Sequence, residues 1–365
     1  MTESESILYW LWLAWVLGPA PASGGELLAL YGSAEGVFAA RGQEDLSGLL
    51  GPTAAGRLLD DACLPASFAP LACRCEALGV RILCWNSPDY PAALAALPDA
   101  PPVLYCTGLL PPQDAPCVGM VGSRRPSQYG MQAAQTIGEE LASAGVVLVS
   151  GLADGLDSAA HRAALSRGMP TVAFLGTAID KTYPACNRAL RRQIEETGTV
   201  LSEYPPGALS NQGYFLQRNR LIAGLSQALC VIEARQKSGT MSTVGHAQRY
   251  GVPVWAVPGS IFSPLSEGAN ALLASGSARA LTGAAGLLAA LGLAPPAAAG
   301  ADAQHSPPQD PEAQAVLRLL GPQPKGLEQL AAGSGLPAGR LLAALTRLEL
   351  SGRAAALAGR QYRLD

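Results

Sequence analysis

The chain has 365 residues, of which 49% are hydrophobic and 15% are charged, so it can bury a large core and is neither a disordered nor a fibrous protein. Its net charge of −3 is low for a nucleic-acid-binding protein, but residues 121–250 hold 13 Lys and Arg against 9 Asp and Glu, and residues 311–365 hold 7 against 4. These two basic blocks favour contact with an anionic partner, although ordinary surface charge would account for the counts equally well.

Residues 1–84 are predicted to form a small helical module of the sterile-alpha-motif or helix–hairpin–helix type, because glycines divide them into short segments. Within it, the apolar segment Ile7–Leu17 is as hydrophobic as a signal peptide. It follows Glu3 and Glu5 rather than basic residues, and it is too short to span a bilayer. We therefore expect a buried helix of this module, no membrane contact and a cytoplasmic protein.

Residues 85–293 alternate short β-rich runs with helical stretches. The expected strands are Cys117–Val121, Val146–Ser150, Thr171–Leu175, Val200–Glu203, Ala228–Glu233 and Pro253–Val257. The expected helices between them are Tyr129–Ala144, Ser158–Arg167, Asn187–Thr197, Asn219–Leu225 and Thr240–Tyr250. Continuously apolar strands separated by helices indicate a parallel sheet buried on both faces. The sequence therefore predicts an α/β domain with an extended, Rossmann-like doubly wound sheet.

The C-terminal part is predicted to be a linker and a second domain. Residues 294–311 are rich in Ala and Pro and read as an extended linker. Residues 312–365 then offer helices at 312–320, 327–332 and 338–350, followed by strands at 354–357 and 361–364 that are joined by a turn at Ala358-Gly359. Three helices and a two-stranded wing describe a winged helix. Arg340 and Arg347 share one face of its last helix, which fits DNA contact and a solvated face equally well.

Glycine-rich loops follow four of the expected strands. They are Gly122-Ser123-Arg124-Arg125, Ser150-Gly151-Leu152-Ala153-Asp154-Gly155, Gly176-Thr177 and Ser238-Gly239-Thr240. The carboxyl ends of parallel strands meet at one edge of the sheet, where glycine lets backbone N–H groups approach a phosphate. Tight turns alone would explain the glycines but not the repeated hydroxyls and arginines. The pattern therefore predicts a phosphate-binding rim.

A second group of candidate binding residues lies in the segment 214–220. Arg218, Asn219 and Arg220 offer donors for phosphate, and Phe215 offers a ring on which an unpaired base can stack. This combination favours single-stranded nucleic acid over a small nucleotide. The alternative is that either arginine is buried and paired with Glu203 or Glu233.

Signals for catalysis, metals and cofactors are weak. Asp157 and His161 lie four residues apart, a spacing that could support base catalysis but more often packs and caps a helix start, so we expect a structural role. The eight cysteines include no C-x-x-C pair, and Cys84, Cys106 and Cys230 are expected to be buried free thiols. The chain has neither a P-loop nor a G-x-G-x-x-G fingerprint. We expect no metal and no cofactor.

The ordered motifs resemble the DNA-processing protein A family (DprA, also called Smf). The resemblance is carried over about residues 85–285 by Tyr90-Pro91, Pro101–Tyr105, Gly108, Val121–Arg124, Ser150–Asp157, Ala160-His161, Leu175–Asp180, Tyr183-Pro184, Asn187, Ser202–Pro205, Phe215, Arg218–Ser226, Ser238–Thr240, Ala256–Gly259, Gly268 and Asn270. The tail is similar to the winged-helix domain that many members carry. The N-terminal module is the loosest match.

This resemblance implies a homodimeric protein that is not an enzyme. Family members bind single-stranded DNA without sequence preference, protect incoming strands in natural transformation and recombination, and load RecA, displacing single-strand-binding protein. The winged helix is a candidate for double-stranded DNA contact. The motifs and the resemblance together give as candidate DNA-binding residues Gly122, Ser123, Arg124, Ser150, Gly151, Gly176, Thr177, Lys181, Phe215, Arg218, Asn219, Arg220, Ser238, Gly239 and Thr240.

The chain departs from the family at one position and leaves two alternatives open. Some members carry a basic DNA contact directly after Tyr-Pro, where this chain has Ala185, so Lys181, Arg188 or Arg191 would have to compensate. A Rossmann-like nucleotide hydrolase of the phosphoribohydrolase type would also need a phosphate pocket. Its usual Pro-Gly-Gly-x-Gly-Thr loop and following Glu are missing around Lys237–Met241. A scaffold for RecA would bind no DNA at all.

Overall fold

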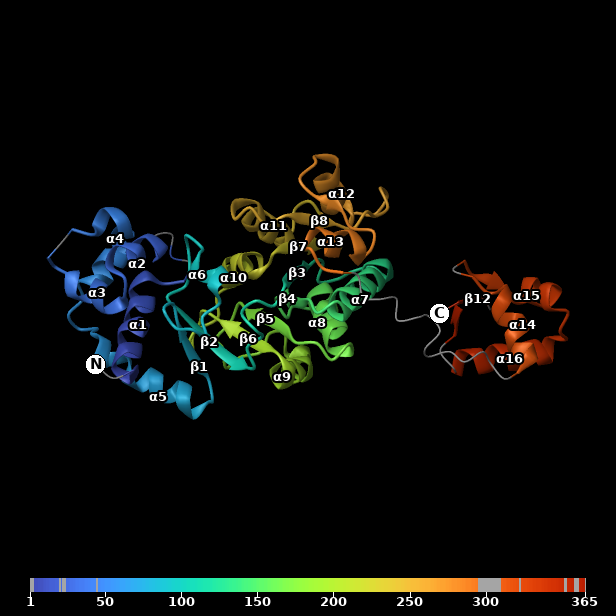
Figure 1. The fold of residues 1–365 in the computed structure, drawn as a ribbon, viewed down its shortest axis with the longest axis horizontal. Helices are drawn as coiled ribbons and strands as arrows, with labels where there is room; N and C mark the ends of the chain where they lie inside the picture. Colours follow the sequence, from blue (N-terminus) through green and yellow to red (C-terminus); the bar gives the residue numbers. More distant parts are fainter. Residues whose placement is uncertain are drawn as a thin grey trace. The chain divides into compact units, whose positions relative to one another are not determined.

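The computed structural model describes residues 3–19, 21, 24–43, 45–294, 310–321, 323–350, 353–357 and 361–364 (Figure 1). Their contacts divide the chain into two compact units, Met1–Pro296 and Ala297–Asp365, and we describe each by itself. The predicted linker at 294–311 and the predicted turn at Ala358-Gly359 lie wholly or almost wholly outside the described residues.

The described part of the first unit contains one sheet of nine strands in the order β1-β2-β6-β5-β4-β3-β7-β8-β9. The strands are β1 (Arg81–Cys84), β2 (Val103–Gly108), β3 (Cys117–Val121), β4 (Val147–Ser150), β5 (Thr171–Leu175), β6 (Thr199–Ser202), β7 (Ala228–Val231), β8 (Val254–Ala256) and β9 (Arg279–Ala280). From β6 to β9 all neighbours are parallel, whereas β2 runs antiparallel to both β6 and β1. The six predicted strands and the doubly wound parallel arrangement are confirmed, while β1, β2 and β9 were not predicted.

Helices cover both faces of the sheet, as continuously buried strands require. On one face, α7 (Gln128–Ser143), α8 (Leu156–Ser166) and α13 (Ala284–Ala290) pack in one core cluster. On the other face lie α10 (Gln212–Leu225), α11 (Gly239–Arg249) and α12 (Glu267–Ala274). Helix α10 was predicted to begin at Asn219, but it begins seven residues earlier. The Asn211 side chain accepts a hydrogen bond from the Gly213 N–H and thereby caps the helix at this earlier start.

The strand order places a topological switch point between β3 and β7. From β3 the chain proceeds to β4, β5 and β6 on one side of the sheet, and it returns to β7 on the other side of β3. The loops that leave β3 and β7 therefore diverge, and in open α/β sheets the crevice between two such loops is where ligands bind.

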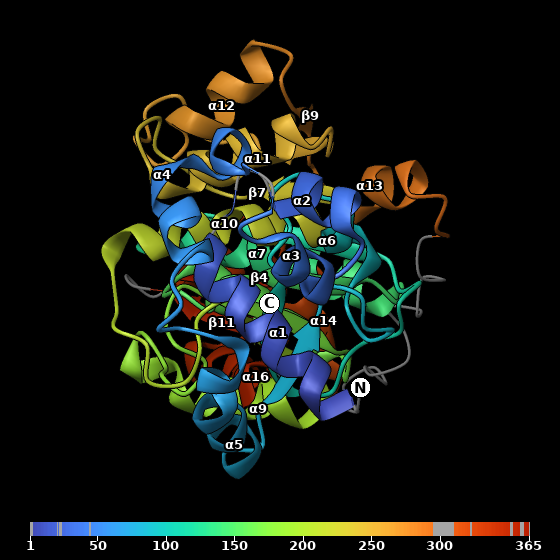
Figure 2. The same ribbon diagram turned by 90° about the vertical axis from the view of Figure 1, so that its left-hand side faces the viewer.

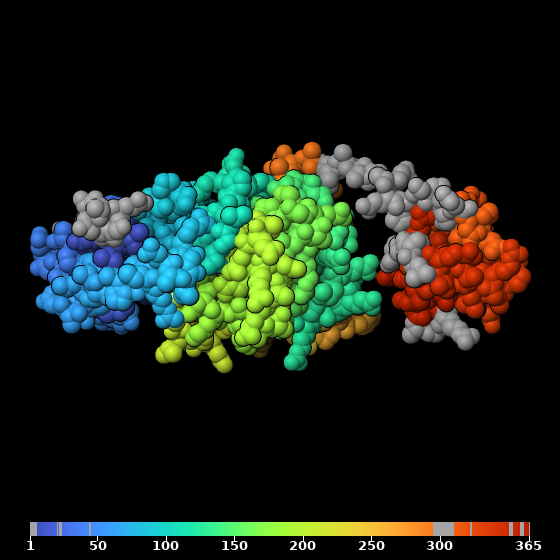
Figure 3. All heavy atoms as spheres, turned by 90° about the horizontal axis from the view of Figure 1, so that it is seen from below, coloured from blue at the N-terminus to red at the C-terminus, as the bar shows by residue number. Residues whose placement is uncertain are grey.

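The N-terminal helices pack against the antiparallel edge of the sheet. They are α1 (Glu3–Leu17), α2 (Gly24–Tyr31), α3 (Ala34–Ala40), α4 (Ser47–Leu58) and α5 (Ala69–Ala77), drawn in blue in Figures 2 and 3. Trp10 and Trp12 of α1 are fully buried, and the Trp12 ring meets Phe38 edge-on at 5.0 Å. Their cluster continues into Val103 and Tyr105 of β2. The prediction of a buried helix over Ile7–Leu17 is confirmed. Among the described residues, no helix is both long and apolar enough to cross a bilayer.

All eight cysteines are free, and Cys84, Cys106 and Cys230 are buried as predicted.

The part of the second unit that the structure describes contains three helices and a small sheet. Helices α14 (Pro311–Leu319), α15 (Leu327–Ser334) and α16 (Ala338–Leu350) pack around Val316, Leu330 and Leu345. Its sheet has the order β10-β12-β11, formed by β10 (Lys325–Gly326), β11 (Ala354–Leu357) and β12 (Gln361–Leu364). This confirms the winged helix and adds β10. On α16, Arg340 pairs with Glu312, and Arg347 pairs with Asp310 at 3.2 Å, so acids at the start of α14 engage both arginines of the predicted recognition face.

The packing of α7 on α8 depends on Gly138. A Cβ at this position would lie 2.7 Å from the Ala163 Cβ and 3.3 Å from a Leu148 methyl group. We expect Gly138→Ala to lower the free energy of unfolding by about 1–3 kcal/mol through overpacking. Gly245→Ala is the control, because Gly245 lies inside α11 with nothing within 4 Å of an added Cβ, and it should raise stability by about 0.5–1 kcal/mol. Urea unfolding measures both, and equal midpoints for the two variants would contradict the packing argument.

Candidate nucleic-acid interface

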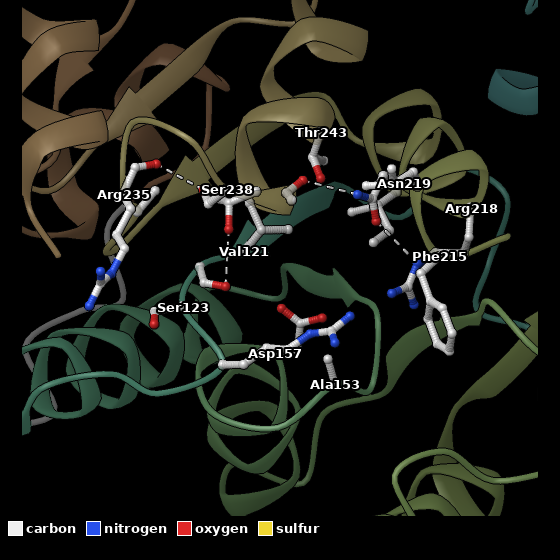
Figure 4. A pocket seen from close by; sticks show the side chains of 17 residues that line it. Val121, Ser123, Ala153, Asp157, Phe215, Arg218, Asn219, Arg235, Ser238 and Thr243 are labelled. Atoms are coloured by element: carbon white, nitrogen blue, oxygen red, sulfur yellow. Dashed lines mark hydrogen bonds between the residues drawn. The ribbon is translucent and has the colours of Figure 1, made fainter. Parts of the chain in front are cut away.

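A cavity of about 410 Å³ lies at the switch point between β3 and β7 (Figure 4). Its walls come from the loops after β3, β4 and β7, from the N-terminal parts of α8 and α11, and from α10 between Phe215 and Ile222. Four segments that are far apart in the sequence thus meet at the carboxyl edge of the sheet, where the glycine-rich loops were expected to gather.

The loop after β3 is fixed by hydrogen bonds to the end of β7. The Ser123 N–H donates to the Glu233 carbonyl at 2.8 Å, and the buried Glu233 carboxylate accepts from the N–H and the hydroxyl of Ser127. Position 122 requires glycine, because the Cβ of any other residue would lie only 2.3 Å from a Leu156 methyl group. The backbone is thereby held in place while the Arg124 side chain stays exposed, with its guanidinium 5.7 Å from the centre of the Phe215 ring.

Arg218 lies behind this exposed arginine. It is 97% buried, and its guanidinium donates to the carbonyls of Gly151 and Phe174. A Cβ at Gly151 would lie 2.3 Å from that guanidinium, so glycine is needed to let the arginine in. Arg218 therefore ties the ends of β4 and β5 to α10 and brings a fixed positive charge to the pocket wall.

Asp157 is the carboxylate among the described residues that line the pocket. Burial raises its pKa, while Arg218 and Arg124 oppose the rise and the N–H groups of Ala153 and Gly151 bond the carboxylate. Burial lowers the pKa of Arg218 to about 10, so Arg218 is still protonated at neutral pH. With Arg124 and Arg235 also lining the pocket, cations outnumber the one acid, and the electrostatics favour an anion.

The start of α11 forms the opposite wall. The Asn219 amide donates to the Gly239 carbonyl at 3.2 Å, and the Thr240 hydroxyl donates to the Gly122 carbonyl at 3.1 Å. The Ser238 hydroxyl likewise donates to the Arg235 carbonyl at 2.9 Å. These side chains hold the loops together, which leaves the backbone N–H groups of the first turn of α11 as the donors for an anion.

Nine of the fifteen predicted site residues line this pocket. They are Gly122, Ser123, Arg124, Phe215, Arg218, Asn219, Ser238, Gly239 and Thr240. Their gathering at one cavity is what the strand-end argument predicts. Whether they touch DNA stays a prediction.

The other six predicted residues lie outside the lining. Gly151 and Gly176 support it from behind, against Arg218 and Phe215 respectively. The Ser150 hydroxyl donates to the Met120 carbonyl, and the Thr177 hydroxyl to the Lys181 carbonyl, so both serve the backbone. Lys181 is exposed and its ammonium donates to the Ala208 carbonyl at 3.2 Å.

Arg220 points away from the pocket. It is 99% buried and pairs with Glu203, with Asp99 also 4.0 Å away. This is the buried ion pair that the sequence left open as the alternative, and it corrects the placement of Arg220 among the pocket residues.

The sequence reasoning missed Arg235. This exposed residue lines the pocket and follows the buried pair Glu233-Ala234 at the end of β7. The sequence does carry a signal for Arg235, because it stands four residues after the end of β7. A residue so close to the carboxyl end of a parallel strand lies at the edge of the sheet where ligands bind.

His161 has the expected structural role. It is fully buried, and its Nδ1 lies 2.8 Å from the Thr171 hydroxyl. Because that hydroxyl donates its own proton to the Leu148 carbonyl, Nδ1 is the donor in this bond. Burial and the nearby Arg218 lower the pKa of His161 to about 3. It does not line the pocket, so it cannot act as a base there.

Together the fold and the pocket define an extended Rossmann-like protein with a cationic cavity at its switch point, followed by a winged helix. The chain belongs to the DNA recombination-mediator protein A family, whose model matches residues 81–292, and the model of the DprA winged helix domain matches residues 293–360.

Relatives of known name agree with this membership. Protein Smf of Synechocystis is 34% identical over 76% of this chain and 78% of that protein, and protein Smf of Escherichia coli is 33% identical over 77% and 80%. DNA processing protein A from Streptococcus pneumoniae matches with a TM-score of 0.63 and 32% identity, over 77% of this chain and 97% of that one. The Helicobacter pylori protein, described for its single-stranded DNA binding mode, matches with a TM-score of 0.53 and 34% identity, over 58% and 95%.

The environment of His161 predicts a pH dependence of stability. Its folded-state pKa of about 3 lies below the ordinary value of 6.5, so the unfolded chain binds the proton first as pH falls. The contribution of neutral His161 to the free energy of unfolding is fully present above pH 6.5 and is lost progressively as the pH falls toward 3. It amounts to a few kcal/mol. We expect His161→Gln to flatten the fall in unfolding free energy over this range, as measured by urea unfolding at several pH values. Parallel curves for the two proteins would show that His161 is not the titrating group.

Proposed function

We propose that this protein binds single-stranded DNA, without sequence preference, through the cavity at the switch point. The observation that carries the proposal is the placement of the exposed Arg124 beside Phe215 at the mouth of a pocket backed by Arg218. Among the described residues, Arg124 has no acidic partner within ion-pair distance. An unpaired guanidinium next to an aromatic ring can hold a phosphate while the ring stacks on the adjoining base.

A single strand suits this site better than a free nucleotide does, because the aromatic surface extends beyond the cavity. The ring of Tyr183, 56% exposed, lies 5.3 Å from Phe215. A free nucleotide would leave this second ring unused, whereas a strand that crosses the mouth can stack on both. Arginines and backbone N–H groups recognise phosphate in any sequence, which supports non-specific binding. The binding mode described for the Helicobacter pylori relative supports the same ligand.

The pocket argues for binding rather than catalysis. Asp157 would be the acid or base of a nucleotide hydrolase, but its carboxylate is already bonded by the N–H groups of Ala153 and Gly151. A carboxylate whose oxygens are used in this way fits a role in ordering the loop better than a role in proton transfer. We therefore assign the protein no enzymatic reaction.

Membership of the family supports the remaining parts of the proposal. We propose that the protein acts in natural transformation and recombination as a homodimer that loads RecA onto the bound strand in place of single-strand-binding protein. Double-stranded DNA contact by the winged helix has less support, because Arg340 and Arg347 are engaged by Glu312 and Asp310.

Replacement of Arg124 tests the pocket. We expect Arg124→Ala to weaken binding to oligo-dT about tenfold and to reduce the slope of log K against log salt by about 0.7, the share of one phosphate contact on a single strand. Arg249→Ala is the matched control, because it removes an exposed positive charge at the far end of α11. Fluorescence anisotropy across a salt series, with a duplex of equal length alongside, measures both.

Two results would contradict the pocket proposal. Equal affinities of Arg124→Ala and Arg249→Ala for oligo-dT would show that Arg124 makes no phosphate contact with the strand. Release of free base from a nucleoside monophosphate would favour the hydrolase instead.

RecA loading can be tested separately on single strands coated with single-strand-binding protein. We expect the wild-type protein to shorten the lag before RecA hydrolyses ATP, because it holds the strand while RecA nucleates. Arg124→Ala should leave the lag long, and Arg249→Ala should behave as wild type. A lag shortened equally by Arg124→Ala would mean that the protein is a RecA scaffold that needs no grip on DNA.

A further inference from the structure

The loop after β8 carries the most exposed large apolar side chain among the described residues. Phe262 is 90% exposed, and its neighbour Ile261 is 82% exposed. Apolar residues scattered singly on a surface are ordinary, whereas apolar side chains that stand together in water are a feature of contact surfaces.

Hydrogen bonds hold this loop in one shape. The Ser263 N–H donates to the Ser260 carbonyl at 3.1 Å, so Ile261 and Phe262 are the two central residues of a closed turn. The Phe262 N–H also donates to the Ser260 hydroxyl at 3.2 Å. At the base of the loop, Gly259 and Asn270 exchange two hydrogen bonds of 3.1 Å. The two side chains are thus presented to solvent by a fixed turn.

The base of the loop lies against the pocket wall. The Gly268 N–H donates to the Ala234 carbonyl at 2.8 Å, and a Cβ on Gly268 would lie 2.9 Å from the Arg235 carbonyl. Strand β8 is parallel to β7, so its loop leaves the same edge of the sheet as the pocket. Figure 4 shows Arg235 on one side of the pocket and Phe215 on the other.

From this arrangement we propose that Ile261 and Phe262 form a second stacking contact for single-stranded DNA, on the side of the pocket opposite Phe215. The proposal rests on the proposed function. A strand whose phosphates lie in the pocket would leave it past the exposed Arg235 and stack its next bases on the turn. Base stacking on an aromatic ring needs no sequence and fits an apolar pair beside a cation.

A second copy of the chain fits this turn less well than DNA does. Among the described residues, Arg235 beside the base of the loop has no acidic partner within ion-pair distance, which favours a polyanion as the partner of this surface. Two side chains are also far less than the ~800 Å² per partner of a stable interface between two copies.

The test compares Phe262→Ser with the wild type on long oligo-dT. We expect affinity to fall about fivefold or more with the salt slope unchanged, because a stacked base is lost and no phosphate contact is. Phe262→Trp should retain wild-type affinity. Leu59→Ser is the control, since Leu59 is 59% exposed in the N-terminal module. In addition, oligo-dT carrying 5-iododeoxyuridine should crosslink on irradiation to the peptide that contains Phe262.

The outcomes separate this inference from the proposed function. If wild type binds and Arg124→Ala is defective, but Phe262→Ser binds as wild type and no crosslink reaches its peptide, only the stacking contact fails. If wild type does not bind oligo-dT, both fail. If Phe262→Ser changes the sedimentation from dimer to monomer with unaltered DNA affinity per protomer, the turn belongs to a contact between copies and the proposal is overturned.

Discussion

The buried carboxylate of Glu233 joins the two halves of the sheet at the point where the pocket forms. It stands at the end of β7, and its oxygens hold the N–H and hydroxyl of Ser127 at the start of α7. The Glu233 carbonyl holds Ser123 from the loop after β3. These bonds anchor the two diverging loops to each other, together with the bond from the Thr240 hydroxyl to the Gly122 carbonyl. Gly130 leaves room for the same carboxylate, since a Cβ there would lie 2.3 Å from its oxygen.

Around this anchor the charges divide into two kinds. Glu233, Asp157 and Arg218 are buried and are bonded mainly by backbone groups, so they fix loop geometry. Arg124 and Arg235 extend from the loops so fixed and remain exposed. A backbone fixed in this way beneath exposed arginines would lower the entropy lost when an anion binds. This division explains why hydroxyls predicted to be phosphate donors instead bond to carbonyls.

The sequence predicted the central sheet because β3 to β8 are buried on both faces and read as continuous apolar runs. Strands β1 and β2 escaped prediction because they are joined to the sheet by antiparallel pairing and lack the helix-to-strand alternation used to find the others. The site was predicted at the level of loops but less well at the level of side chains. Arg218 and Arg220 are two positions apart on α10, about 200° around a helix, so one facing the pocket forces the other away from it. Once α10 is known to begin at Gln212, that geometry follows from the sequence alone.

The small number of cations in the pocket limits how strongly one pocket can bind an anion. With Arg124, Arg235 and the buried Arg218 as its cations, the pocket can neutralise about three phosphates, which on a single strand gives a salt slope of about −2. Under the proposed function, such a contact would be weak at physiological salt, and stacking of a base on Phe215 would add affinity that salt does not remove. Tight binding then requires several pockets on one strand, because a second attached pocket binds at a high effective concentration. Under the proposed function, such a protein would hold a long strand firmly yet release each short stretch easily, as the transfer of a strand to RecA requires.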